Sequence, residues 1–203
     1  MILSLLEKHL PEKSILFCYR LWETSPFKFR VTKKRETKLG DYRYHYQHQS
    51  HTITINGDLN KYTFLVTYLH EVAHLKTQIM YGNKVKPHGQ EWKTEFKKLL
   101  DPVMHEEIFP ENILHALKKY LLNPKASSCT DLHLVKALGA HDERTHLKYL
   151  SDVLQGETFR FNKKYYLKES INRTRAICKD IKSGRKYYIS EGAQVEVLQK
   201  SLF

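Results

Sequence analysis

Cysteine is scarce in this chain of 203 residues. The three cysteines, Cys18, Cys129 and Cys178, stand far apart and form no CxxC pair. Because a disulfide-stabilised domain and a cysteine zinc ribbon both need paired cysteines, the sequence argues against both. Scattered single cysteines favour a reducing, intracellular compartment.

Long apolar runs are also missing. The N-terminal stretch MILSLLEKHLPEK is too short in its apolar part for a signal peptide, and lysines and a proline interrupt it. No segment approaches the roughly 18 consecutive apolar residues of a membrane-spanning helix. We therefore expect a cytoplasmic protein, nucleoid-associated if bacterial, with no membrane partner.

Acidic residues are too few to balance the basic ones, since 34 Lys and Arg face 22 Asp and Glu, which gives a net charge of +12. Such a balance attracts polyanions, nucleic acid first and anionic membranes next. A basic protein that charge merely keeps soluble is the alternative. The hydrophobic fraction of 41% is sufficient for a packed core.

The N-terminal part is predicted to combine helices with short strands. Apolar residues recur at helical spacing in the segments 1–10, 12–24, 60–82, 90–100 and 110–122. Alternation with period two predicts strands at 27–31, 42–46 and 51–56, which we expect to form a small antiparallel sheet with turns at KLGD and NGD. In the central helix, Asn60 is the expected N-cap and Gly82 the expected stop.

The C-terminal part is predicted to be a separate, smaller unit. We expect residues 123–150 to be a linker with a short helical segment, and 151–203 to be a small basic β-rich domain. Five strands are predicted in the segments TFRF, KKYYL, RTRAICKD, RKYYIS and VEVL, with a hairpin turn at 182–184. The chain is therefore expected to have an α+β architecture, with a first domain over 1–122.

The stretch HEVAHL at 70–75 carries the strongest chemical signal. Residues four apart share one face of a helix, so His70 and His74 can present both imidazoles to one metal ion. Glu71 lies about 100° further round the helix and can accept a proton from a water on that metal. The alternative is a chance match, but burying three ionisable groups in an apolar helix is costly unless a metal compensates.

A catalytic zinc usually has three protein ligands, so a third must come from elsewhere. His88, in KPHGQEWK, follows His74 by 14 residues, and turns near Gly82 and 87–89 let the chain reverse. Glu95 is the rival ligand, because a glutamate on the next helix serves another class of zinc peptidase. We favour His88. A metzincin arrangement is excluded, since Met80 stands where its third histidine is required.

A second set of metal-ligating residues has looser spacing and lies in the expected linker. We interpret these residues as surface groups and not as a metal site: Cys129, His133, His141 and His146.

Basic residues concentrate in two regions. The longer region, from Arg160 to Lys186, interleaves cations with aromatic residues that either stack on bases or form the domain core. A shorter run lies beside the predicted sheet. No helix that would read a groove is apparent, so we expect sequence-independent DNA binding. The candidate contacts are Lys33, Lys34, Arg35, Arg160, Lys163, Lys164, Arg173, Arg175, Arg185 and Lys186.

The order of these motifs resembles the SprT family of zinc metalloproteases, which includes the eukaryotic Spartan proteases. The resemblance covers 35–104 and is carried by four segments: RETKLGDYRY (35–44), HTITINGDLN (51–60), FLVTYLHEVAHL (64–75) and HGQEWKTEF (88–96). It implies a zincin-like catalytic domain in which His70, His74 and His88 bind one catalytic Zn²⁺ and Glu71 is the general base. It also implies cleavage of proteins bound or crosslinked to DNA.

Several members of that family carry a C-terminal zinc ribbon with two cysteine pairs, whereas this chain has only Cys178 in the corresponding region. We expect packing to replace the metal there, and a degenerate ribbon and an SH3-like barrel both fit 151–203. The sequence leaves two rival functions beside a DNA-associated endopeptidase. One is a non-proteolytic zinc scaffold in a nucleic-acid or transcription-associated protein, and the other is a peptidase indifferent to DNA.

Overall fold

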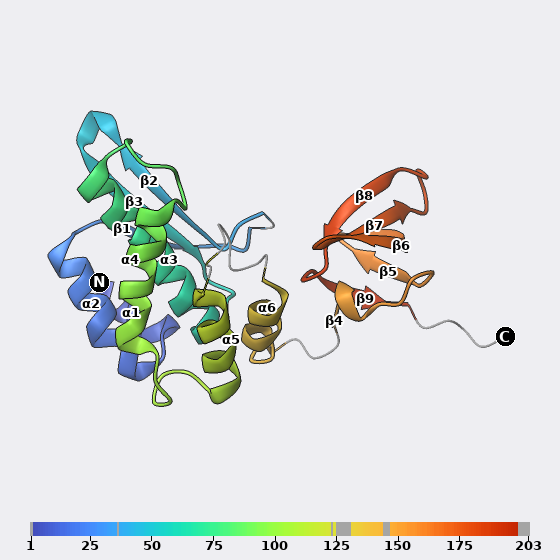
Figure 1. Cartoon of the computed structure of the whole chain (residues 1–203), viewed down its shortest axis with the longest axis horizontal. Coiled ribbons are helices and arrows are strands. Elements are labelled where there is room, and N and C mark those ends of the chain that lie inside the picture. Colours follow the sequence, from blue (N-terminus) through green and yellow to red (C-terminus); the bar gives the residue numbers. More distant parts are fainter. Residues whose placement is uncertain (1, 36, 123, 125–130, 144–146, 199–203) are drawn as a thin grey trace. The chain divides into compact units, whose positions relative to one another are not determined.

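The structure, a computed structural model, describes residues 2–35, 37–122, 124, 131–143 and 147–198 (Figure 1). The chain divides into two compact units. The first comprises residues 1–128 and 137–141, and the second comprises 129–136 and 142–203. None of the helices in the described ranges combines the length and apolar character needed to cross a membrane.

The first unit mixes helices and strands, as predicted. Figure 1 shows its helices lying beside a three-stranded sheet. The elements are α1 (Ile2–His9), α2 (Ile15–Thr24), β1 (Lys28–Thr32), β2 (Gly40–His45), β3 (Ser50–Asn56), α3 (Lys61–Tyr81), α4 (Gln90–Leu100) and α5 (Glu111–Leu121). A further helix, α6 (Leu132–Gly139), follows in the chain.

The central helix α3 begins and ends where the sequence predicted. The Asn60 side chain accepts hydrogen bonds from the backbone N–H groups of Tyr62 and Thr63, which satisfies two donors that the helix leaves unpaired. Gly82 ends the helix with a φ of 57°, a conformation in which glycine has no Cβ to clash. Most of α3 is buried, so its position in the fold is fixed by packing on several sides.

The pairing of the three strands corrects the predicted antiparallel sheet. The strand order is β1-β3-β2, with β3 antiparallel to β2 but parallel to β1. A short connection joins β2 to β3 and sets their antiparallel pairing. β1 takes the other side of β3, where Phe29 packs edge-on against Tyr68 of α3 at a ring distance of 5.7 Å. The sheet is therefore mixed, and β2 forms one of its edges.

The two faces of this sheet differ in character. Ile53 and Ile55 of β3 are fully buried on the face that packs against the helices. The residues that alternate with them, Thr52 and Thr54, are only partly buried and belong to the opposite face. This opposite face is called the outer face below.

The second unit is a six-stranded antiparallel sheet with the order β4-β9-β5-β6-β7-β8. All five predicted strands are present, and Gly184 turns between β7 and β8 with a φ of 70°. The strands are β4 (Lys148–Tyr149), β5 (Thr158–Phe161), β6 (Lys164–Asn172), β7 (Arg175–Asp180), β8 (Lys186–Ser190) and β9 (Gln194–Val197).

The core of the second unit contains an ion pair. Lys168 is 2% exposed, and its Nζ lies 3.1 Å from Glu191 Oε1 and donates a hydrogen bond of 2.6 Å to the Leu150 carbonyl. The apolar core of this unit includes Phe159 and Cys178, which are both fully buried, and Cys178 is the strand neighbour of Lys168. Cys178 thus packs in the core of this unit.

Candidate metal centre and basic surfaces

Three histidines from two parts of the first unit converge at one point. His70 and His74 lie one turn apart on α3, and His88 lies just before α4. The Nε2 atom of His88 is 2.9 Å from Nε2 of His74 and 3.3 Å from Nε2 of His70. Three ring nitrogens that face one another at these distances can coordinate a single ion.

The connection between α3 and α4 returns His88 to the helix. After Gly82 the chain reverses, and the Gly89 N–H donates to the Lys86 carbonyl at 2.9 Å to close a tight turn. His88 itself has a φ of 57°, in the left-handed region that side chains other than glycine rarely adopt. This backbone conformation is a local cost of placing the imidazole against α3.

Trp92 forms the floor of the centre. Its indole ring is fully buried and lies 4.6 Å from the His70 ring, 5.3 Å from the His74 ring and 4.8 Å from the His88 ring, measured between centroids. Its Nε1–H donates to the His70 carbonyl at 3.4 Å. One side chain from α4 therefore restricts the positions of all three imidazoles.

The imidazoles are held in their neutral form. Burial, with a smaller contribution from the neighbouring rings, lowers the pKa of His70 well below its usual value and that of His74 to about 3. Burial also lowers the pKa of His88. Neutral imidazole is the form that binds a metal, and a set of nitrogen ligands suits Zn²⁺. The donor set therefore fits the expected zinc.

Glu71 lies between α3 and the edge strand β2. It is buried, and the backbone N–H of Tyr42 donates a hydrogen bond to its carboxylate. Gly40 leaves room for this carboxylate, since a Cβ there would lie 2.5 Å from Glu71 Oε1. KLGD was predicted to be a turn, but Gly40 and Asp41 are the first residues of β2. The glycine serves close packing against Glu71.

The pKa of Glu71 is set by opposing influences. Burial raises its pKa to about 8, and the nearby carboxylate of Asp41 adds to this shift. The hydrogen bond from Tyr42 and the charges of Arg35 and Lys38 act in the opposite direction. A cation bound by the histidines would also lower this pKa, because an opposite charge favours the carboxylate.

The rival ligand has another partner. Glu95 is buried on α4, and its Oε1 accepts a hydrogen bond of 2.8 Å from Lys98 Nζ. His70, His74 and His88 form a set that could hold a metal ion, and Glu95 is not part of this set.

The second set of metal-ligating residues is not brought together in the part of the chain that the structure describes. His141 contacts Asn112 Oδ1 at 3.3 Å, and no metal-binding group among the described residues contains His141 or His133. Cys129 and His146 lie outside the described residues.

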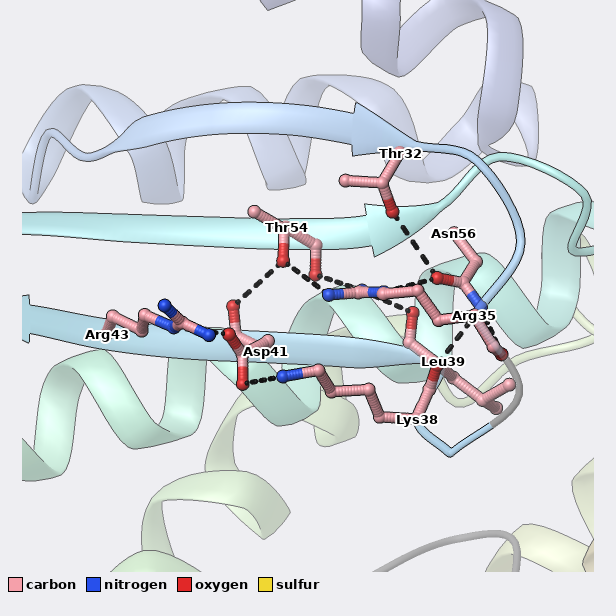
Figure 2. Close-up of polar contacts among 8 residues, drawn as sticks. All are labelled: Thr32, Arg35, Lys38, Leu39, Asp41, Arg43, Thr54 and Asn56. Carbon is pink, nitrogen blue, oxygen red and sulfur yellow. Dashed lines mark hydrogen bonds and ion pairs between the residues drawn. The ribbon is translucent and has the colours of Figure 1, made fainter.

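Of the basic run beside the sheet, Lys33 and Lys34 are exposed and Arg35 is engaged within the fold. Figure 2 shows the Arg35 side chain lying along the outer face of the sheet. Its Nε donates to Asn56 Oδ1 at 2.7 Å and its Nη1 to Thr54 Oγ1 at 3.0 Å, while Nη2 reaches two carbonyls at 3.3 Å. Arg35 thus fastens the loop before β2 to β3.

The other candidate contacts are exposed in the second unit. The strand register places four cations on the side of the sheet opposite the core, together with the exposed Tyr165 and Tyr188: Arg160, Arg175, Lys179 and Lys186. Lys163 and Arg173 lie at turns with positive φ, Lys164 is 3.9 Å from Asp180, and Arg185 precedes β8. Phe159 and Tyr166 are core residues, so the aromatic residues of this region divide between core and surface.

Sequence reasoning did not identify three residues that shape the site. Trp92 lies in the segment 90–100, which was predicted only to be helical, although it follows His88 by just four residues. Tyr42 stacks on His74 with an interplanar angle of 9° and bonds to His51 Nδ1 at 2.8 Å. For Gly40, the sequence pattern indicated only a turn. These contacts depend on how β2 docks on α3, which local patterns do not encode.

Comparison with known proteins identifies a family for the first unit. Neither the curated proteins nor the solved structures provide a match to the chain. The model of the SprT-like family matches residues 9–109, a range that contains the three histidines, Glu71 and the sheet. This family is generally one of zinc-dependent metalloproteases. Through residues 9–109, the chain belongs to the SprT-like family.

Proposed function

We propose that the chain is a zinc-dependent endopeptidase that cleaves proteins bound or crosslinked to DNA. The observation that carries the peptidase assignment is the convergence of His70, His74 and His88 beside the buried Glu71. A pure scaffold would need the three ligands but would have no use for a carboxylate buried next to them.

The histidines would hold the ion, and each remaining residue has a separate task. Zinc in this position supplies a Lewis acid that polarises a carbonyl and makes water more acidic. Glu71 takes the proton of the attacking water and passes it to the leaving amine. The Tyr42 N–H orients the Glu71 carboxylate, and Trp92 keeps the imidazoles in place.

Strand β2 offers a place for an extended substrate chain. The Asn56 N–H bonds to the Leu39 carbonyl at 2.9 Å, so Leu39 and the alternating residues after it face β3. The backbone groups of the residues between them, Tyr42 and Tyr44, point away from β3; because the Tyr42 N–H bonds to Glu71, an added strand would pair with the Tyr42 carbonyl and the backbone groups of Tyr44. Tyr42 lies beside Glu71, so a polypeptide added to this edge would run past the general base.

The second unit supports the DNA part of the proposal. Its four outward cations would contact phosphates, with Arg160 and Lys186 exchanging their present ion pairs with Glu196 and Glu169. Tyr165 and Tyr188, 47% and 58% exposed, are available to stack on unpaired bases. Contacts of this kind read no sequence, in agreement with the expectation from composition.

The proposal is tested with Glu71→Gln and His88→Ala, assayed on a protein crosslinked to DNA. Glu71→Gln should retain zinc and lose cleavage, whereas His88→Ala should lose most of its zinc by elemental analysis. Glu95→Ala is the matched control, because it removes the rival ligand. Full activity of Glu71→Gln, or zinc lost from Glu95→Ala and kept by His88→Ala, would contradict the assigned roles.

The part played by DNA is tested by adding single-stranded or double-stranded DNA to the wild-type reaction. Cleavage that DNA stimulates supports the proposal. Cleavage at the same rate with and without DNA would indicate a peptidase acting on free polypeptides. DNA binding with no cleavage, even of unfolded substrates, would indicate the zinc scaffold.

A further inference from the structure

The outer face of the catalytic sheet carries a second concentration of positive charge, on the opposite face of the sheet from α3 and its metal centre. A hollow of about 410 Å³ lies on this face. We call it the cationic trough. Its lining includes four cations and two central threonines: Lys28, Arg30, Arg35, Arg43, Thr52 and Thr54. Asp41 is the one carboxylate in the lining, so the trough has a net formal charge of +3 with histidine neutral.

The strand register arranges these side chains in rows. Lys28 of β1 and Arg43 of β2 both pair with Thr52 of β3, so a hydroxyl lies between two cations. In the next row, Arg30 and Asp41 flank Thr54 in the same way. Residues two apart on a strand are about 6.6 Å apart. The cations therefore repeat along β1, from Lys28 to Arg30, with Arg43 facing them across β3, and do not cluster around one point.

The floor of the trough is fixed, while its rim is free. Arg35 is held by Asn56 and Thr54, and Asp41 receives Lys38 and Arg43 at 2.7 Å each (Figure 2). Lys28 and Arg30 are exposed, and within the described ranges of the chain neither side chain has an ion-pair or hydrogen-bond partner. Two cations without partners beside a preorganised polar floor are suited to an external anion.

The chemistry of the lining identifies the anion. Arginine, lysine and threonine side chains are common donors to phosphate oxygens in nucleic-acid complexes. Apart from His45, no aromatic side chain belongs to the lining residues, so bases have no surface on which to stack. A repeating row of cations fits a repeating chain of phosphates better than a single phosphate. We propose that the cationic trough binds the phosphodiester backbone of a nucleic acid, independently of sequence.

The cationic trough and the surroundings of Glu71 share strand β2. β2 contributes Arg43 to the trough and, on its other side, the backbone that contacts Glu71. A nucleic acid in the trough and a polypeptide on the β2 edge would thus contact the same strand. The binding proposal does not depend on catalysis, and its test is a binding measurement.

The test compares two double variants of the full chain, both in a Glu71→Gln background so that cleavage cannot affect the result. Lys28→Gln/Arg30→Gln removes the free cations of the rim. Lys118→Gln/Lys119→Gln removes the same charge from exposed positions on α5 and is the control. The affinity for a short DNA duplex is measured over a series of salt concentrations, and thermal unfolding confirms that each variant is folded.

Each phosphate contact contributes about 0.9 to the slope of log affinity against log salt on duplex DNA. The trough variant should therefore lower the magnitude of the slope by about 1.8, while the control should leave it unchanged. Equal slopes for the trough variant and the wild type would overturn the proposal. So would equal losses in both variants, because net charge alone would then explain them.

A third arm separates nucleic acid from other polyanions. Phosphatidylcholine vesicles containing phosphatidylserine, and polyglutamate, are offered to the same proteins. If the trough substitutions abolish binding to either of these and leave the DNA slope intact, the trough serves a membrane surface or an acidic polypeptide, and the proposal is refuted.

Discussion

Gly40→Ala would test whether the position of Glu71 limits the reaction. The added Cβ would lie 2.5 Å from Glu71 Oε1 and 2.7 Å from Thr67 Cγ2. An ordinary contact needs roughly 3.5 Å, so the carboxylate would have to move by about 1 Å. Because Glu71 is buried, its side chain cannot swing aside into solvent.

A displacement of about 1 Å at a reacting group can lower the rate on the order of 100-fold. This factor corresponds to about 2.7 kcal/mol of activation free energy. Overpacking of the same contact should also lower the free energy of unfolding by about 1–3 kcal/mol. We expect kcat to fall about 100-fold while KM changes little and zinc content is unchanged.

Gly57→Ala is the matched control. A Cβ at Gly57 would lie 2.7 Å from Val31 Cγ1, so the steric conflict is similar but distant from Glu71. Neither glycine has a positive φ, and alanine is therefore not excluded by backbone conformation at either position. Cleavage of a crosslinked protein is measured beside zinc content and thermal unfolding. A Gly40→Ala protein that cleaves at the wild-type rate would refute the argument, as would equal loss of kcat in the control.

Two further predictions concern stability, and each is checked by denaturant unfolding of the full chain. Lys168→Met leaves the buried Glu191 carboxylate without its partner and should lower the free energy of unfolding by about 3–5 kcal/mol. Lys186→Met is the contrasting variant, because the Lys186 side chain is 63% exposed in its ion pair with Glu169. This substitution should lower the free energy of unfolding by less than about 1 kcal/mol. Similar losses in the two variants would contradict this account. Asn60→Ala removes two capping hydrogen bonds from α3 and the hydrogen bond from Asn60 Nδ2 to the Leu138 carbonyl, and should cost about 1–2 kcal/mol. Asn60→Asp keeps the capping oxygen and loses only the donor to Leu138, so a loss as large as that of alanine would show that capping is not the cause.

The sequence predicted those parts of the fold that depend on local order. The bounds of α3 followed from Asn60 and Gly82, because capping and chain reversal are decided by the residues at the helix ends. The shared face of His70 and His74 followed from helical periodicity alone. Alternation with period two located β1, β2 and β3, since it reports which side chains face the core.

Strand pairing could not be predicted in the same way. Alternation shows that a segment is a strand but does not identify its neighbour, so the parallel pairing of β1 with β3 was missed. Arg35 illustrates the same limit for charged residues. A cation in a basic run looks available for DNA, yet this one bonds to Asn56 and Thr54, which lie about 20 residues further along the chain.

The position of β2 has a consequence for how this protein tolerates mutation. Four consecutive residues of this strand serve different sites, with Gly40 and Tyr42 against Glu71 and with Asp41 and Arg43 on the outer face. A substitution that tilts the strand therefore changes both sites together. Double-mutant cycles between Arg43 and Glu71 should show non-additive free energies, although the two side chains lie on opposite faces of the sheet. Selection on one face of β2 would thus constrain the other, and neither function could change independently along this strand.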